Sequence, residues 1–344
     1  MNMHRWLGIL AGTAVITSGS RQAEAIVVVD DASLFRQQAL PGQFSGVVSL
    51  EGDVFSDGTS IPFCTGSLLK GGLHILTAAH CLTEDTNQIS PGLINQPFFA
   101  TFNLASGVTQ VPILDLFIFQ GWDGTLTNGN DIAILSLLEP APSEAEQYDI
   151  YRETNELGQI FTKVGYGRTG NGIDGETTTN GLVAYFGQNQ FEGTEADLVN
   201  LLISPPTNPA PFSQLLFDFD SGFRSNNLLG SLGLGINEVN TASGDSGGPA
   251  FIDNRIAGIT SYGVGGFGLL LATDIDELTN STFGELSGET RVSTYASFVD
   301  GVLLGNIAAS AQNTAAIPEP STILGMAIFG GWMLRRRKVQ KRDR

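Results

Sequence analysis

A serine stands among glycines in the segment Gly244-Asp245-Ser246-Gly247-Gly248-Pro249. The glycines let the backbone turn sharply and let a substrate approach closely. Backbone N–H groups on such a turn can point at one spot and stabilise a negatively charged oxygen. The segment therefore indicates a nucleophilic serine, although an ordinary Gly-rich surface loop has the same composition.

Two further segments supply the partners that a serine nucleophile needs. Thr77-Ala78-Ala79-His80-Cys81 places a histidine at the end of an apolar run, and Asn130-Asp131-Ile132-Ala133 places an aspartate at the start of another. A serine hydroxyl becomes a good nucleophile when a base takes its proton, and a carboxylate orients that base. Read alone, Asp131 also fits a turn or a strand cap.

The three blocks follow in the chain order His, Asp, Ser, which is the order of the chymotrypsin barrels. On these motifs the chain resembles the trypsin- and chymotrypsin-like serine proteases, from about Ile26 to about Val302. The resemblance implies His80 as general base, Asp131 as its orienting carboxylate and Ser246 as nucleophile. It also implies that the N–H groups of Gly244 and Ser246 form the oxyanion hole.

The resemblance also implies a substrate-binding pocket. By the family's spacing, Asn240 lies at the base of the pocket for the side chain that precedes the scissile bond. The strand that pairs with the substrate backbone is expected to contain Ser261, Tyr262 and Gly263. A neutral base predicts an apolar or small side chain rather than Arg or Lys, unless the inserted segment 264–288 brings Asp274 or Asp276 into the pocket.

Activation in the resembling family requires a new N-terminus, whose ammonium group inserts beside the aspartate that precedes the nucleophile. Asp245 holds that position here, and cleavage after Ala25 would expose Ile26-Val27 directly. A buried ammonium is unfavourable unless it is paired. The resemblance therefore predicts that Ile26 pairs with Asp245 and that leader removal itself activates the protein.

The chain contains two cysteines, Cys64 and Cys81. In an exported chain an isolated pair indicates a disulfide. The family resemblance supports the same pairing, which would clip together the two segments around the histidine loop.

Composition and pattern favour an all-β fold. The 344 residues include 43 glycines, and short runs rich in Val, Ile, Phe and Thr alternate with Gly, Asn, Asp and Ser turns. The length suits two domains. The resemblance implies two six-stranded antiparallel Greek-key barrels, roughly 26–150 and 151–305, with the active site in the cleft between them and a short C-terminal helix.

Both ends indicate targeting segments. Residues 1–25 combine a basic start, a short apolar run and the small-residue site Ala23-Glu24-Ala25, as in a signal peptide. After an expected linker over 306–317, residues 318–344 carry Pro318-Glu319-Pro320, an apolar run and a basic end. This order resembles PEP-CTERM sorting signals, which implies an exosortase-like processing enzyme besides signal peptidase; a plain C-terminal membrane anchor is the alternative.

The net charge of −18 excludes nucleic acid as a partner, since most of the few basic residues lie in the two end segments. No cofactor or metal is expected at the catalytic residues. If the acidic loops bind Ca²⁺, Asp218 and Asp220 are the candidate ligands.

The sequence therefore predicts an exported serine endopeptidase at the cell surface or in the extracellular matrix. Its tail would hold it at the membrane transiently or permanently. Its substrates would be proteins or peptides. Two alternatives stay open: a catalytically silent adhesion protein on the same fold, and a serine esterase.

Overall fold

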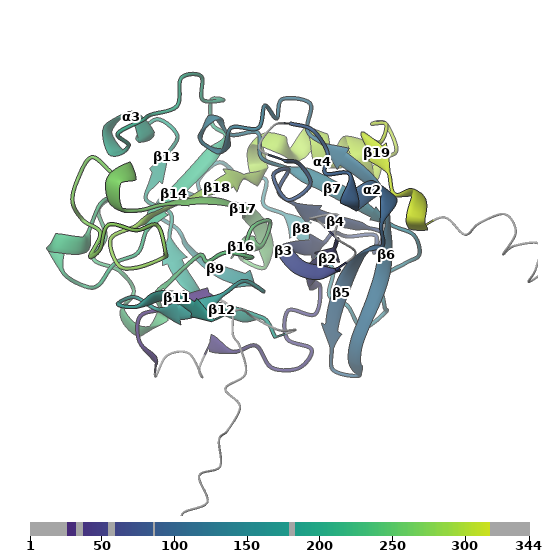
Figure 1. Ribbon diagram of the computed structural model, residues 1–344, viewed down its shortest axis with the longest axis horizontal. Helices are drawn as coiled ribbons and strands as arrows, with labels where there is room; N and C mark the ends of the chain where they lie inside the picture. The colour runs from purple at the N-terminus through teal and green to yellow at the C-terminus, as the bar shows by residue number, and fades with distance from the viewer. Residues whose placement is uncertain (1–25, 32–36, 54–58, 85–86, 179–182, 317–344) are drawn as a thin grey trace, which may run out of the picture.

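The computed structural model describes residues 26–31, 37–53, 59–84, 87–178 and 183–316, and these form two β-rich halves that lie side by side (Figure 1). The expected signal peptide and the expected sorting segment, 318–344, lie outside the described residues. Within them, no helix has both the length and the apolarity that crossing a bilayer requires.

The first half is a closed barrel of six antiparallel strands. Their order is β6-β5-β2-β3-β4-β7, and β7 pairs back onto β6. The strands are β2 (Val47–Gly52), β3 (Ile61–Leu68), β4 (His74–Thr77), β5 (Phe98–Leu104), β6 (Gly107–Ile118) and β7 (Ala133–Leu137). Alternate side chains of a strand point to the same face of the sheet. The side chains that point into the barrel form its core. In β5 the buried series is Phe98, Ala100, Phe102 and Leu104.

The second half is a curved half-barrel sheet in the order β12-β9-β16-β17-β18-β14-β13, and β8 (Asp149–Ile150) pairs in parallel with β17. Three aromatic rings fill its centre: the ring of Phe161 stacks on that of Phe191, with centroids 4.1 Å apart, and meets that of Phe217 edge to face, with centroids 5.0 Å apart. The strands are β9 (Ile160–Gly165), β12 (Tyr185–Gln190), β13 (Gly193–Thr194), β14 (Gln214–Asp218), β16 (Pro249–Ile252), β17 (Arg255–Val264) and β18 (Leu286–Arg291).

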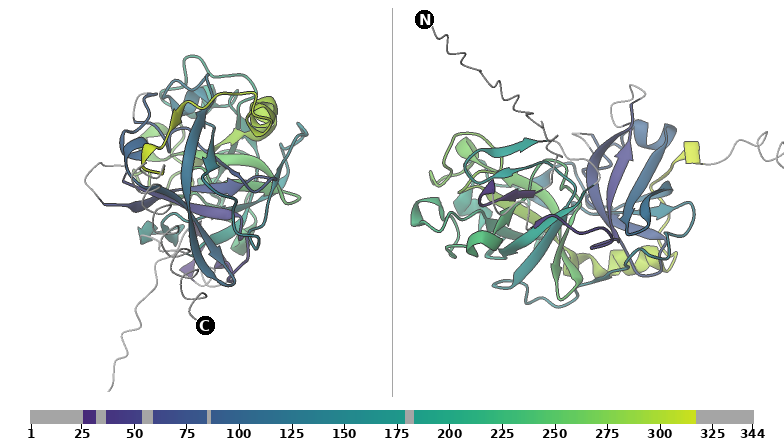
Figure 2. Two further views of the ribbon diagram at one scale, coloured as in Figure 1. Left: turned by 90° about the vertical axis from the view of Figure 1, so that its right-hand side faces the viewer. Right: turned by 90° about the horizontal axis from the view of Figure 1, so that it is seen from below.

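The N-terminal strand β1 (Ile26–Val28) belongs to the second half, although the sequence places it beside the first. It lies between β10 (Thr169–Asn171) and β15 (Val239–Asn240), and β11 (Gly175–Thr178) completes this small sheet. All three side chains of β1 are fully buried. Figure 2 shows the purple strand within the teal and green half.

The C-terminal segment crosses in the opposite direction and packs on the first barrel. The turn η5 (Val292–Tyr295) leads into helix α4 (Ala296–Leu303). Phe298 of this helix packs against Phe119, and their ring centroids are 5.4 Å apart. Beyond it, β19 (Ala311–Gln312) pairs with β6 (Figure 2). Within the linker expected over 306–317, the backbone N–H groups of Ser310 and Asn313 donate to the carbonyls of Leu116 and Leu114 on the barrel. This backbone pairing could not be predicted from the sequence, because the stretch is polar and lacks the apolar pattern of a strand.

The remaining helical elements are single turns. They are α2 (Gly92–Asn95), α3 (Leu198–Leu201), η1 (Leu126–Asn128), η2 (Arg224–Asn226), η3 (Gly235–Asn237), η4 (Gly266–Gly268) and η6 (Thr314–Ala316). The predicted all-β fold class with one short C-terminal helix is therefore confirmed, with a closed first barrel and a half-barrel second sheet.

A buried ion pair lies inside the second half. Lys163 on β9 and Glu289 on β18 are both fully buried, and the Lys163 ammonium donates to Glu289 and to the hydroxyl of Thr260 on β17. Burial raises the pKa of Glu289, which the charge of Lys163 opposes. Each side chain is the charged partner of the other, and an isolated buried charge would be strongly unfavourable.

The first prediction concerns this ion pair. Lys163→Met should lower the free energy of unfolding by about 3–5 kcal/mol, because it leaves Glu289 buried without its partner. The double variant Lys163→Met/Glu289→Leu should regain most of that loss, since apolar pairs of similar volume replace buried ion pairs well. Urea unfolding of the three proteins measures both quantities. A double variant that is as unstable as the single one would contradict the assignment of the loss to the unpaired carboxylate.

Candidate active site

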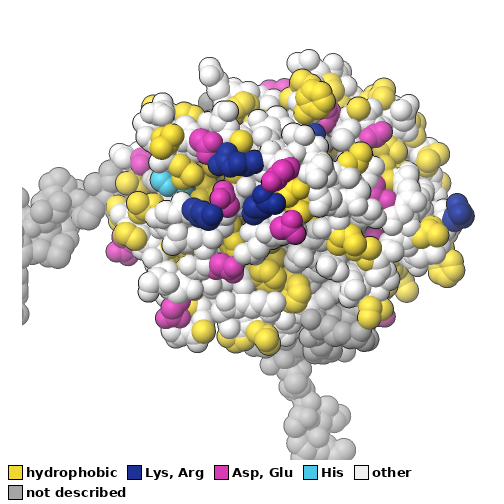
Figure 3. All heavy atoms as spheres, turned by 180° about the vertical axis from the view of Figure 1, so that it is seen from behind, with side chains coloured by type: hydrophobic (Ala, Val, Ile, Leu, Met, Phe, Trp, Pro, Cys, Tyr) yellow, Lys and Arg dark blue, Asp and Glu magenta, His cyan; other side chains and the backbone are white. Residues whose placement is uncertain are grey.

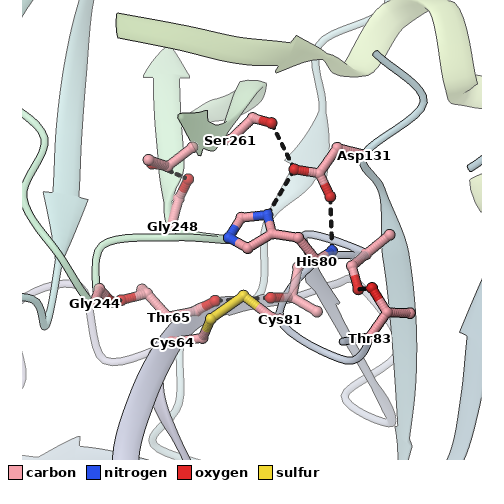
Figure 4. Close-up of a disulfide and its surroundings, with 12 residues drawn as sticks. Cys64, Thr65, His80, Cys81, Thr83, Asp131, Gly244, Gly248 and Ser261 are labelled. Carbon is pink, nitrogen blue, oxygen red and sulfur yellow. Dashed lines mark hydrogen bonds and ion pairs between the residues drawn. A yellow bond between two sulfur atoms is a disulfide. The ribbon is translucent and has the colours of Figure 1, made fainter. Parts of the chain in front are cut away.

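His80 and Asp131 reach the same edge of the first barrel because the strands beside them are paired. His80 lies in the turn after β4, Asp131 lies just before β7, and Thr77 of β4 pairs with Ala133 of β7. Nδ1 of His80 lies 2.7 Å from Oδ2 of Asp131, and the backbone N–H of His80 donates to Oδ1 at 2.8 Å (Figure 4). Asp131 therefore fixes both the ring and the backbone of His80.

The electrostatics of this pair suit a base. Asp131 is fully buried, whereas the His80 side chain is 24% exposed. Burial lowers the pKa of His80, but the charge of Asp131 and the hydrogen bond to it raise that pKa by more, so it lies above the usual histidine value. With Nδ1 directed at the carboxylate, Nε2 is the ring atom that can accept a proton from elsewhere.

Ser246 lies in a tight turn between β15 and β16, on the second half. Gly244 and Gly247 of this turn have φ values of +98° and +79°, which glycine adopts without strain. A Cβ on Gly247 would lie 2.1 Å from the hydroxyl oxygen of Thr77, so the turn packs directly against the end of β4. That close packing brings the serine turn beside the His80 loop.

Two backbone groups of the turn remain available. Within the described part of the chain, neither the N–H of Gly244 nor that of Ser246 donates to a protein acceptor, whereas Asp245, Gly247 and Gly248 all do. Two such neighbouring donors can bind a developing oxyanion. Among the described residues no hydrogen bond joins Ser246 to His80; such bonds are often long in enzymes without substrate.

Thr65 on β3 attaches the serine turn to the first barrel. Its backbone N–H donates to the carbonyl of Ser246 at 2.8 Å, and its hydroxyl donates to the carbonyl of Gly244 at 2.9 Å. The same hydroxyl accepts the N–H of Tyr166 at 3.1 Å, and the Thr65 carbonyl accepts from Thr77 at 2.9 Å. One residue therefore contacts both halves at the site.

The predicted disulfide between Cys64 and Cys81 is present, with the two Cα atoms 6.2 Å apart. It joins β3, next to Thr65, to the residue that follows His80 (Figure 4). The cross-link therefore restrains the segment that carries the base against the segment that holds the serine turn.

Ser261 has a contact that the sequence analysis missed. Its hydroxyl donates to Oδ2 of Asp131 at 2.5 Å, while Thr290 donates to the Asp131 carbonyl at 2.7 Å. The pairing of β17 with β18 shifts register between Thr260 and Tyr262, so Ser261 sits at a bulge. Bulges redirect side chains near active sites, and nothing in the sequence of this strand marks one.

The predicted substrate-binding residues line one cavity of about 160 Å³ next to Ser246. Asn240 is part of a neutral network: its Oδ1 accepts from Ser287 at 2.7 Å and from the N–H of Thr241 at 2.9 Å. The walls are rich in hydroxyl groups. The lining includes Asn240, Thr241, Ser246, Thr260, Ser261, Tyr262, Gly263, Ser281 and Ser287.

Two carboxylates also line the cavity, and the sequence analysis identified neither. Glu285 comes from the inserted segment, and its Oε1 accepts the N–H of Asn280 at 2.8 Å; burial raises the pKa of Glu285 to about 7. Glu176 on β11 accepts the N–H of Ser243 at 2.7 Å. Asp274 and Asp276 are not among the lining residues; Asp274 instead accepts from the backbone of Gly266.

Asp245 is fully buried, and its two oxygens accept the N–H groups of Gly167 at 2.9 Å and Ala242 at 2.8 Å. Burial raises its pKa to about 7 in spite of these bonds. Val27 pairs with Asn240, which puts Ile26 in the strand beside the segment that leads to Asp245. No ion pair of Asp245 occurs among the described residues. The candidate calcium ligands Asp218 and Asp220 are buried at the end of β14, outside the lining of the cavity.

Parts of the chain are similar in sequence to trypsin and chymotrypsin. The family model described as Trypsin matches residues 37–197. Trypsin Tyr p 3.0101 of Tyrophagus putrescentiae is 26% identical over 203 residues, which is 59% of this chain and 64% of that protein. Chymotrypsin-C of Rattus norvegicus is 32% identical over 105 residues, 30% of this chain and 36% of that protein. The chain thus spans less than two thirds of either relative's length.

Among solved structures, neuropsin, a serine protease expressed in the limbic system of mouse brain, aligns with a TM-score of 0.53 at 14% sequence identity. The alignment covers 78% of this chain and 98% of neuropsin, so the two share a fold. The trypsin family model thus matches one segment of this chain, and the likeness to neuropsin shows a shared fold.

Proposed function

We propose that this chain, as a relative of the trypsin-like serine proteases, is an exported endopeptidase that cleaves proteins or peptides through Ser246, His80 and Asp131. The observation that carries the proposal is the His80–Asp131 pair beside a serine turn with two unused N–H groups. A buried carboxylate on one imidazole nitrogen leaves the other as a base. The free N–H groups supply the charge stabilisation that acyl transfer needs.

In this mechanism His80 removes the proton of the Ser246 hydroxyl as the oxygen attacks the peptide carbonyl. The carbonyl oxygen, now negatively charged, lies against the N–H groups of Gly244 and Ser246. His80 then gives its proton to the leaving amine, and an acyl-enzyme remains. Water, deprotonated by His80, hydrolyses that ester and restores Ser246.

We also propose that the protein is exported and held at the cell surface or in the matrix. The leader and tail motifs support this localisation, with signal peptidase and an exosortase-like enzyme as processing partners. The exterior is consistent with a protein substrate rather than nucleic acid. On the face in Figure 3 most of the few basic side chains lie beside acidic ones, and Lys70–Asp149 and Arg152–Asp300 are exposed ion pairs. Anionic ligands therefore find little unpaired positive charge on this face.

The second prediction tests the catalytic residues. Alanine at Ser246, His80 or Asp131 should each lower kcat by roughly three to six orders of magnitude, and the losses should not add, because the residues act as one unit. Because the pKa of His80 is raised and only the neutral ring acts as a base, activity should fall with decreasing pH from a higher pH than an ordinary histidine would give. Steady-state kinetics on casein measure both effects.

The native chain and its alanine variants also distinguish the endopeptidase from the two alternative functions. A fluorophosphonate probe should label the native chain and not Ser246→Ala; absence of labelling would favour the silent adhesion protein. Cleavage of small esters without cleavage of casein would favour the esterase. Near-normal turnover in any one alanine variant would remove that residue from the assignment.

The third prediction concerns the N-terminus. If cleavage occurs after Ala25, Ile26 begins the buried strand β1, and its ammonium could pair with the buried carboxylate of Asp245. One extra residue before Ile26 should lower kcat/KM by at least roughly tenfold, since a buried charge without its partner is strongly unfavourable. N-terminal sequencing of the active protein checks the cleavage site. Full activity of the extended variant would show that the N-terminus has no such role.

The fourth prediction concerns specificity. The sequence predicts an apolar or small side chain in this pocket. The neutral residue at its base and its hydroxyl-lined walls favour the small side chains among these, and uncharged polar ones as well. A peptide library should show no dominant cleavage after Arg or Lys. Asn240→Asp places a charge at the base and should raise relative cleavage after those residues by roughly tenfold or more. Dominant Arg or Lys cleavage by the native protein would instead assign selection to Glu285 or Glu176.

A further inference from the structure

Four carboxylates converge in the second half, away from the catalytic residues. Asp218 ends β14, Asp220 follows it, Glu192 lies between β12 and β13, and Glu238 lies just before β15. One ligand oxygen each of Glu192, Asp218 and Asp220 lies within 4.8 Å of the others. Oxygens that surround one Ca²⁺ ion at 2.3–2.6 Å have such separations. Figure 1 shows β13 and β14 side by side in this region.

Some of the buried carboxylate oxygens in this cluster lack the hydrogen-bond donors that buried polar atoms normally have. Asp220 is 3% exposed, and neither of its two oxygens accepts a hydrogen bond. Oδ1 of Asp218 and Oε2 of Glu192 are likewise buried and accept no N–H group, and these two carboxyl groups interact with each other. The great majority of buried polar atoms are hydrogen-bonded, so the two unpartnered oxygens of Asp220, close to those of Asp218 and Glu192, indicate a bound cation.

No basic side chain of the described residues forms an ion pair with this cluster. None of the ion pairs among the described residues involves Glu192, Asp218, Asp220 or Glu238. Burial, and then the charges of its neighbours, raise the pKa of Asp220 to about 9. Burial also raises the pKa of Glu192 to about 8 and that of Glu238 to about 7. A cation would relieve both the desolvation and the repulsion.

Backbone hydrogen bonds hold the other oxygens in position. Oδ2 of Asp218 accepts the N–H of Leu229 at 3.2 Å and also that of Leu228. Oε1 of Glu238 accepts the N–H of Asp220 at 3.1 Å. These backbone hydrogen bonds fix the positions of the Asp218 and Glu238 carboxylates.

We propose that Glu192, Asp218 and Asp220 bind a Ca²⁺ ion, with Glu238 completing the negative charge of the site. Ca²⁺ accepts several carboxylates in irregular geometry, whereas Mg²⁺ requires a near-ideal octahedron and retains water. A buried cluster made of carboxylates therefore favours Ca²⁺. The site adds Glu192 and Glu238 to the two aspartates that the sequence indicated.

The ion would stabilise the floor of the substrate pocket. Phe219, between the two aspartates, faces the opposite way and packs in one cluster with Val27 and Ala242. Glu238 directly precedes Val239–Asn240, the strand that pairs with β1 and supplies the pocket base. A cation at this point ties together the end of β14, the pocket base and the N-terminal strand.

The test uses the full chain carrying Ser246→Ala, so that self-cleavage does not contribute and peptidase activity is not needed. After EDTA treatment, calorimetric titration with CaCl₂ should show saturable binding. The midpoint temperature of thermal unfolding, Tm, should rise by roughly 5 °C or more when the Ca²⁺ concentration far exceeds Kd. MgCl₂ should raise Tm much less. No binding heat together with equal Tm values in CaCl₂ and EDTA, or equal effects of MgCl₂ and CaCl₂, would overturn the proposal.

Matched variants locate the site. Asp220→Asn should weaken Ca²⁺ binding by roughly tenfold or more, because ligand charge sets affinity. Glu192→Gln, at a partly exposed position, gives a second variant should Asp220→Asn fold poorly. Asp253→Asn, which removes an exposed carboxylate of the same half, should bind like the parent. Unchanged affinity in both Asp220→Asn and Glu192→Gln would place the ion elsewhere and refute the assignment.

Discussion

The hydrogen bonds of Thr65 are the contact on which the arrangement of the candidate site depends. His80 and Asp131 are fixed within the first barrel, whereas Ser246 and its two N–H groups belong to the second half. The two sets are useful only at one relative position. Thr65 sets that position by binding the serine turn through two hydrogen bonds, and Ser261 adds a third link by donating to Asp131. All three are short polar contacts, so they define a geometry that apolar packing alone would leave less specific.

Sequence reasoning succeeded where local chemistry decides the structure. Glycines with positive φ around Ser246, the cysteine pair and the apolar runs beside His80 and Asp131 each have a physical meaning within a few residues, and the fold class and disulfide follow from them. The hydrogen bond from Ser261 to Asp131 depends on a bulge in the pairing of β17 with β18. Glu285 reaches the pocket because its inserted segment folds back on it. These contacts join residues far apart in the chain, and no local pattern encodes them.

The two halves of the molecule are stabilised by different physics. The first barrel has a large apolar core built from alternating strand residues. The second half buries the Lys163–Glu289 pair, Asp245, and the carboxylates of Asp218, Asp220 and Glu238 near β14. Buried charges contribute favourably only when each has a partner. The second half therefore depends on partners for its charges, and these lie close to the nucleophile and the pocket.

The exchanged termini determine how the molecule holds together. The first strand completes the small sheet of the second half, while the last helix and strand lie on the first barrel. The small sheet of the second half and the full sheet of the first barrel are therefore complete only when the far end of the polypeptide has arrived, so contacts of large sequence separation must form before either sheet is finished. Such a topology slows folding and couples both halves into one cooperative transition. It also means that neither half, produced alone, carries all the strands of its own sheet.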